Sequence, residues 1–173
     1  MFIKLWGVRG SITAPLSNTE YHQKISRIIE HVLSSNHGKS ASVDDIISSL
    51  PEKLRYVYGG NTTCATLTSD SGKTYILDCG SGLRAVGYDL MKGDCAKGKG
   101  EVNVFLTHNH WDHIQGLPFF TPLYIQGNKI HFYSPYPNQH ELLRAQMSAP
   151  FFPAPFDGTA SEKRFTTLEK GKI

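Results

Sequence analysis

The sequence predicts a layered fold that combines α-helices with β-strands, of the α/β or α+β type. Short β-prone segments alternate along the chain with segments whose apolar residues recur every three or four positions. The chain has 173 residues, of which 39% are hydrophobic and 19% charged, and this is enough for one globular core and argues against disorder. We therefore expect a single domain over residues 1–173.

The first part of the chain predicts a strand followed by two helices. Residues 1–6 alternate between two faces and run into glycines, which is typical of a strand and a turn. A capping-box pattern that starts at Ser17 predicts an amphipathic helix. A second, shorter helix is predicted to begin at Ser42 and to end near Pro51. We interpret residues 17–55 as a helical insertion within the domain.

The rest of the chain predicts strands interleaved with helices. Four further β segments are predicted at residues 65–68, 74–77, 102–106 and 129–133. Residues 82–92 and 139–147 predict helices, the second with Asn138 as its cap. The segment 150–156 holds three prolines and three phenylalanines, so it cannot continue a helix and is too apolar to leave in water. We expect it to cover a cavity or to pack on a partner.

Composition excludes several classes of protein. No stretch approaches the roughly 20 apolar residues of a membrane span, and the N-terminus lacks the pattern of a signal peptide. We therefore expect a cytoplasmic protein without a membrane partner. The cysteines are Cys64, Cys79 and Cys95, an odd number without CxxC spacing, which favours buried or idle thiols over disulfides or a thiolate zinc site.

The charge of the chain mildly favours anionic partners. The formal net charge is +3 and the pI is about 8.7, without the dense basic stripe of a dedicated nucleic-acid binder. The local basic cluster Lys92, Lys97 and Lys99 lies in a Gly-rich segment, which we interpret as a solvated loop.

Four candidate metal ligands fall within six residues, directly after a predicted strand. They are His108, His110, Asp112 and His113. Zinc prefers imidazole nitrogen and carboxylate oxygen as ligands. Residues two apart in an extended loop face the same way, so His108 and His110 can bind one ion while Asp112 and His113 address a second. A structural or surface histidine cluster is the alternative, but four such groups so close together would cost solvation for no structural return.

This pattern predicts hydrolysis. Two ions about 3.5 to 4 Å apart lower the pKa of a bridging water toward about 7, which provides hydroxide as a nucleophile at neutral pH. The same ions can stabilise the charge that develops on a phosphoryl or carbonyl oxygen. The sequence shows no redox-active ligand set, so a hydrolase is favoured over an oxidoreductase.

The motif resembles the HxHxDH signature of metallo-β-lactamase-fold hydrolases. The segment 77–82 (LDCGSG) is similar to that family's upstream Asp-x-Gly element. Residues 6–11 (WGVRGS) and 59–64 (GGNTTC) resemble the phosphodiesterase-like branch, which includes the tRNA 3′-processing endonuclease and the phosphonate-pathway cyclic phosphodiesterase. The resemblance covers most of the chain outside the helical insertion.

The resemblance implies an αβ/βα sandwich with two zinc ions, or Mn²⁺ or Fe²⁺ in their place. It assigns His108 and His110 to one ion and Asp112 and His113 to the other. Asp112 and Asp78 are then the candidate catalytic residues, with Asp78 orienting the ligands from behind. A turn-capping carboxylate is the alternative for Asp78.

The role of two smaller groups of residues is left open by the sequence. Residues 61–63 fit a simple turn nearly as well as a substrate contact. His131, in a predicted strand, and His140, at a predicted helix start, are poor candidates for further ligands.

The family's remaining ligands, from the second half of its fold, are not recognisable. We therefore expect the chain to be the N-terminal portion of a longer protein, which self-associates or binds a complementary C-terminal segment. The first functional hypothesis is a zinc-dependent hydrolase of phosphodiester bonds in an anionic small molecule, a nucleotide or RNA. The alternatives are a hydrolase of a lactam, lactone or thioester, and a non-catalytic fold remnant that binds metal or a partner.

Overall fold

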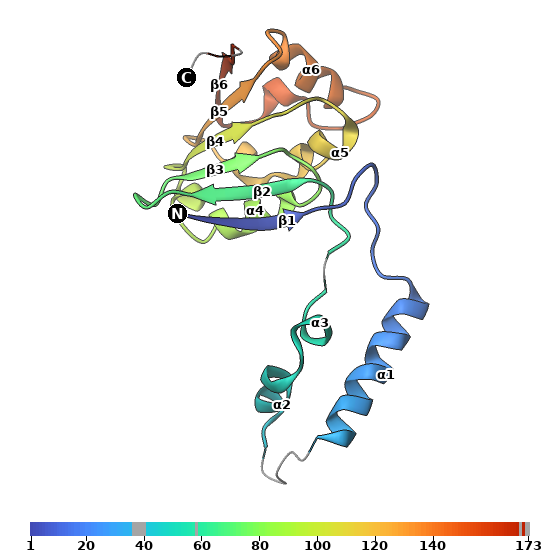
Figure 1. Ribbon diagram of the computed structural model, residues 1–173. Helices are drawn as coiled ribbons and strands as arrows, with labels where there is room; N and C mark the ends of the chain where they lie inside the picture. The colour runs from blue at the N-terminus through green and yellow to red at the C-terminus, as the bar shows by residue number, and fades with distance from the viewer. Residues whose placement is uncertain (36–40, 58, 170, 172–173) are drawn as a thin grey trace. The chain divides into compact units, whose positions relative to one another are not determined.

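The computed structural model describes residues 1–35, 41–57, 59–169 and 171, and the chain divides into two units (Figure 1). One unit combines Met1–Thr13 with Asn61–Ile173 and contains the sheet. The other is Ala14–Gly60, within which the predicted insertion at residues 17–55 falls. Helices and a six-stranded sheet occur together in the described residues, which confirms the mixed α/β class.

The sheet has the strand order β1-β2-β3-β4-β5-β6. Its strands are β1 (Phe2–Gly7), β2 (Cys64–Thr68), β3 (Thr74–Leu77), β4 (Glu101–Phe105), β5 (Lys129–Ser134) and β6 (Glu162–Thr167). The first three strands pair antiparallel, and β3 to β6 pair parallel. Parallel strands need crossover connections, and these carry the helices α4 (Leu83–Leu90), α5 (Trp111–Ile114) and α6 (Gln139–Gln146).

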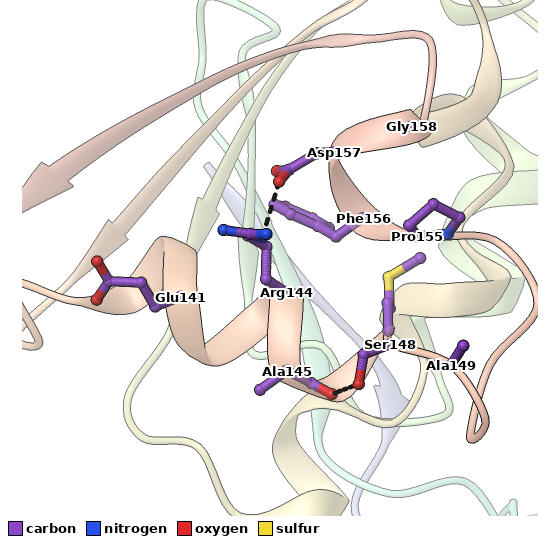
Figure 2. Close-up of a pocket in the computed structure, with 10 residues that line it drawn as sticks. Glu141, Arg144, Ala145, Ser148, Ala149, Pro155, Phe156, Asp157 and Gly158 are labelled. Carbon is purple, nitrogen blue, oxygen red and sulfur yellow. Dashed lines mark hydrogen bonds and ion pairs between the residues drawn. The ribbon is translucent and has the colours of Figure 1, made fainter.

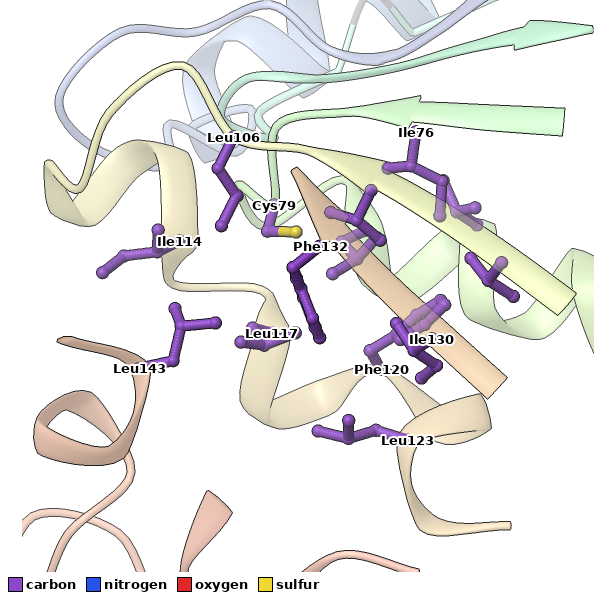
Figure 3. Packing of buried hydrophobic residues seen from close by; sticks show 14 of the residues in the cluster. Ile76, Cys79, Leu106, Ile114, Leu117, Phe120, Leu123, Ile130, Phe132 and Leu143 are labelled. Atoms are coloured by element: carbon purple, nitrogen blue, oxygen red, sulfur yellow. The ribbon is translucent and has the colours of Figure 1, made fainter. Parts of the chain in front are cut away.

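The hydrophobic core lies between one face of the sheet and the crossover helices (Figure 3). Ile76, Val104 and Phe132 stand beside one another on β3, β4 and β5, and each is at most 1% exposed. Leu83 of α4 and Leu143 of α6 pack into the same cluster and are fully buried. The two-residue periodicity therefore predicted the strands on one side of this core, and the periodicity of three to four residues predicted the helices on the other side.

The opposite face of the parallel strands carries a row of aromatic rings. Phe105 stacks on Tyr133 with ring centroids 4.5 Å apart, and Tyr75 meets Phe105 edge-on at 6.2 Å. His131 stacks on Tyr133 at 4.2 Å. These four side chains are only partly buried.

Strand β6 was not predicted from the sequence. Its inward side chains are Lys163 and Phe165, and its outward ones include Glu162 and Arg164, so its apolar signal is weak. Charged side chains are common on edge strands because they discourage pairing with other chains. Phe165 nevertheless stacks on Phe132 at 5.2 Å, so the strand is joined to the core.

Two expectations for the region around α6 are met only in part. Phe151 and Phe156 each line a cavity, as expected, but Phe156 is 1% exposed and belongs to the chain's own core, whereas Phe151 is 82% exposed. Its sequence could not distinguish them, because both are phenylalanines beside proline. Asn138 precedes α6 but makes no side-chain capping hydrogen bond.

The helical unit is described by itself. It contains α1 (Asn18–Ser34), α2 (Val43–Ser49) and α3 (Glu52–Arg55), of which α3 was not predicted. Ser17 forms the predicted capping box with Glu20, and Ser42 caps α2 in the same way. No helix in the described residues is long and apolar enough to cross a membrane.

Candidate metal site

The predicted ligand motif follows the carboxyl end of β4. Strands β3 and β4 are parallel, so their carboxyl ends lie side by side, and the N–H of Asp78 donates to the carbonyl of Phe105 (2.9 Å). Leu106 is buried, and after it the chain runs through His108 and His110 before α5 begins at Trp111. This edge of a parallel sheet is where α/β proteins commonly place their sites.

Asp78 lies beneath the motif as a buried carboxylate, 4% exposed. Its Oδ1 accepts a hydrogen bond from the backbone N–H of Thr107 (2.8 Å), and its two oxygens lie 3.0 and 2.9 Å from the hydroxyl of Thr107. Its Oδ2 is 2.8 Å from Nδ1 of His113. Asp78 therefore caps a backbone 29 residues away in the sequence, not only its own turn.

These contacts define which ring nitrogens are available. A carboxylate can only accept, so His113 donates from Nδ1 to Asp78 and keeps Nε2 free as a metal donor. For the same reason the single hydroxyl hydrogen of Thr107 goes to Asp78, and its oxygen accepts from Nδ1 of His108, 3.0 Å away. His108 is thereby held in the same tautomer as His113, which sequence reasoning did not anticipate.

The motif's side chains are brought together. The ring of His108 lies 4.5 Å from that of His110 and 4.1 Å from that of His113, measured between centroids. Nε2 of His113 is 3.5 Å from Oδ2 of Asp112. The rings thus form one cluster and not two separate pairs.

Asp112 is held by the loop that follows β1. The backbone N–H of Ser11 donates to Oδ2 of Asp112 (2.9 Å). This hydrogen bond is the main cause that lowers the pKa of Asp112, against the opposing effect of burial. Ser11 had no assigned role beyond its place in the segment 6–11.

Both loops that contact the motif carry backbone strain. Asp78 has φ of +59° and Ser11 has φ of +62°, and they are the non-glycine residues in the left-handed region among those described. Such conformations cost free energy in non-glycine residues and cluster at functional sites. Here the strained residue Asp78 places its carboxylate against the ligand motif, and the strained residue Ser11 places its backbone N–H there.

A metal ion requires three or more donors that converge. Among the described residues, no group of three or more His, Cys, Asp or Glu side chains is placed so that it could hold one. The donor types fit zinc, and Asp78 and Thr107 leave the required nitrogens of His113 and His108 free. The case for a metal therefore rests on donor chemistry and orientation, not on a formed coordination shell.

The segments around residues 62 and 80 act as packing elements below the motif. Thr62 and Ser81 exchange two hydrogen bonds of 2.9 Å, each between a backbone N–H and a side-chain oxygen. A Cβ on Gly80 would lie 2.4 Å from the carbonyl oxygen of Asp112 and 2.5 Å from that of Thr63. Glycine at position 80 thus permits the close approach of the backbone at Asp112 and Thr63.

Other candidate residues lie away from the cluster. Nε2 of His131 is 2.7 Å from the hydroxyl of Thr166, and His140 pairs with Asp157 at 2.6 Å. Lys92 pairs with Asp89 at 2.8 Å on the surface. The cysteines at 64, 79 and 95 are free and buried.

Two cavities lie near α6. One, of about 550 Å³, lies between α6 and residues 155–158, where Arg144 pairs with Asp157 at 2.8 Å (Figure 2). None of the predicted ligands lines it. The other, of about 360 Å³, adjoins the motif through Asn109 and Trp111.

Comparison of the chain with models of protein families, with curated proteins and with solved structures found no match. The metallo-β-lactamase resemblance therefore remains a prediction from the motifs in the sequence.

Proposed function

We propose that this chain carries the metal-binding part of a zinc-dependent hydrolase of phosphodiester bonds, related to the metallo-β-lactamase-fold enzymes. The observation that carries the proposal is the network around Asp78, which joins Thr107, His108 and His113. A carboxylate behind a histidine is the usual arrangement of a metal-ligating imidazole, because it fixes the tautomer and raises the basicity of the other nitrogen.

Each residue of the cluster has a distinct part in this proposal. His108, His110, Asp112 and His113 would hold zinc, which supplies Lewis acidity and lowers the pKa of a water molecule. Asp78 orients two of the three imidazoles. The N–H of Ser11 holds Oδ2 of Asp112 and lowers the pKa of that carboxyl further, which favours the ionised form that binds a cation.

Two features support an anionic, phosphate-containing substrate and a cytoplasmic setting. The chain has a formal net charge of +3, which mildly favours an anionic small molecule, a nucleotide or RNA over a neutral lactone or lactam. Its three cysteines are free, as is usual for proteins of the reducing cytoplasm.

We also propose that the aromatic face of the sheet is covered, by a second copy of the chain or by a complementary segment. Ile3 and Leu5 on β1 are 61% and 66% exposed, and Leu77 of β3 is 37% exposed. Exposed apolar patches of this kind mark interaction surfaces. Light scattering of the purified chain would test the second copy, because self-association should raise the mass with protein concentration. A chain that stays monomeric at high concentration would contradict self-association.

The test of the main proposal measures zinc and turnover on the same samples. Zinc content is determined by mass spectrometry for the wild type and for His110→Ala. The rate of hydrolysis of bis-p-nitrophenyl phosphate is measured on the same two proteins. His22→Ala, an exposed histidine of α1, is the matched control. We expect both signals to fall in His110→Ala alone. Zinc binding without turnover would favour a non-catalytic metal-binding remnant. Turnover of a lactone or thioester alone would favour the alternative hydrolase that acts on carbonyl compounds. Equal zinc content in all variants would reject the proposed metal site.

A further inference from the structure

The 360 Å³ pocket beside the ligand motif has the composition of a small-molecule site. Its wall includes Asn109 and Trp111 from the motif segment, Leu142 and Gln146 from α6, and Phe151. Ligand pockets of this size are usually apolar with a few fixed polar groups. Asn109 and Trp111 are chain neighbours of the candidate ligands at 108, 110 and 112, so the pocket borders the segment that carries those ligands.

Two large aromatic side chains border this pocket and are left in water. Trp111 is 63% exposed and Phe151 is 82% exposed. Neither makes a ring contact in the described part of the chain, unlike Phe152, which meets Phe119 edge-on at 5.9 Å. Exposed aromatic faces at a pocket can stack on a flat ring of a ligand.

The polar groups of the pocket are held in fixed orientations. Asn109 and Gln139 exchange two hydrogen bonds between their amides, of 3.2 and 2.7 Å. Gln146 donates from Nε2 to the carbonyl of Ile114 (2.8 Å), and because a carbonyl can only accept, this fixes the orientation of its amide.

The second atom of the Gln146 amide is unsatisfied. Its Oε1 is buried and has no hydrogen-bond partner among the described residues. Buried acceptors are normally paired, and each exception calls for an explanation. A donor on a ligand that enters the pocket would supply the missing hydrogen bond.

We propose that this pocket binds a flat aromatic ring that carries an N–H donor, such as a nucleobase, as part of the substrate. This inference rests on the proposed function, since it names the group attached to the phosphodiester. Trp111 and Phe151 would contact the faces of the ring, Leu142 would pack against its apolar edge, and Gln146 would accept from its N–H group.

The experiment measures binding by calorimetry, in zinc and in EDTA, with three probes. These are adenosine 5′-monophosphate, ribose 5-phosphate without a base, and phenyl phosphate, which has a ring but no donor. We expect adenosine monophosphate to bind about 5- to 150-fold more tightly than ribose 5-phosphate, the range that base stacking on aromatic side chains provides. Phenyl phosphate should lie between them.

Variants then assign the effect to the pocket. Phe151→Ser should reduce the affinity for adenosine monophosphate and leave that for ribose 5-phosphate unchanged, and its exposure means that the fold does not depend on it. Phe119→Ser, another exposed phenylalanine (56%) outside the pocket, is the control. Gln146→Leu should make adenosine monophosphate and phenyl phosphate bind alike.

Three results would overturn the inference. They are equal binding of adenosine monophosphate and ribose 5-phosphate, equal loss of both in Phe151→Ser, and wild-type binding of phenyl phosphate as tight as that of adenosine monophosphate. Failure of the proposed function would look different. Ring-dependent binding would then persist in EDTA, while bis-p-nitrophenyl phosphate would not be hydrolysed in zinc.

Discussion

Asp78→Asn is the substitution that tests the candidate site most directly. Asparagine has nearly the same shape and tolerates the left-handed backbone of residue 78, where φ is +59°, better than most residues do. The change therefore removes the charge and one acceptor without adding backbone strain.

The structure shows why the amide cannot replace the carboxylate. One oxygen of Asp78 accepts from the N–H of Thr107, and the other accepts from Nδ1 of His113. An amide has one oxygen and one NH₂ group, so in either orientation its NH₂ faces a donor. Either the contact with Thr107 is lost, or His113 must move its proton to Nε2 and cease to be a ligand there.

The expected loss follows from these contacts. A hydrogen bond to a charged group contributes about 1.5–3 kcal/mol, and a defect behind a metal ligand typically lowers affinity about 10- to 100-fold, or about 1.4–2.7 kcal/mol. The two estimates agree, so we expect zinc affinity to fall by this factor while part of the binding remains.

The assay is competition with a chelator of known affinity, combined with NMR of the histidine ring nitrogens. The wild type should show His113 protonated at Nδ1, and Asp78→Asn should reduce that population. Asp94→Asn, at an exposed carboxylate that pairs weakly with Lys97 at 3.9 Å, is the control. Unchanged zinc affinity together with an unchanged tautomer would refute the reasoning and leave Asp78 as a structural cap.

Three further predictions concern Thr107, Gly80 and Cys64. Thr107→Val should lower zinc affinity several-fold and Thr107→Ser should not, because the hydroxyl holds His108; equal affinities in the chelator assay would contradict this. Gly80→Ala should destabilise the fold by about 1–3 kcal/mol or more in urea unfolding, because its Cβ would meet two backbone oxygens, whereas Gly10→Ala, with open space around it, should be near neutral. Burial raises the pKa of the Cys64 thiol to about 12, so the folded chain retains a proton that the unfolded chain releases above its ordinary pKa of 9.0. The contribution of this thiol to the free energy of unfolding should be constant below about pH 9 and should then fall by about 1.4 kcal/mol per pH unit as the pH approaches 12. Cys64→Ala should show a shallower decline, and an equal slope would count against it.

Local patterns in the sequence were sufficient to predict much of the fold. The capping box predicted at Ser17 and the helix start predicted at Ser42 depend on residues close together in the sequence, and both helices begin where they were predicted. Strands with strong alternation or apolar runs were found within one or two residues. Strand β6 was missed because it binds the sheet through backbone pairing with β5, while its own side chains are largely polar.

The candidate site was predictable only in part, because spacing reveals neighbours in the chain and not neighbours in space. The four ligand candidates lie within six residues and could be recognised together. Thr107 is adjacent to them, but its role depends on a carboxylate 29 positions earlier. Ser11 lies 101 positions from Asp112, and nothing in its local sequence indicates that its N–H reaches that side chain.

The hydrogen bonds of Asp78, Thr107 and Ser11 also predict how strongly each residue affects zinc affinity. Asp78 contacts the backbone of the motif, one imidazole directly and a second through Thr107, so its loss affects both the position and the protonation of the ligands. Thr107 acts on one imidazole only, and Ser11 on one carboxylate only. If the cluster holds a metal as a unit, the loss of zinc affinity should therefore decrease from Asp78→Asn to Thr107→Val. The reverse order would mean that the histidines bind independently of the carboxylate beneath them.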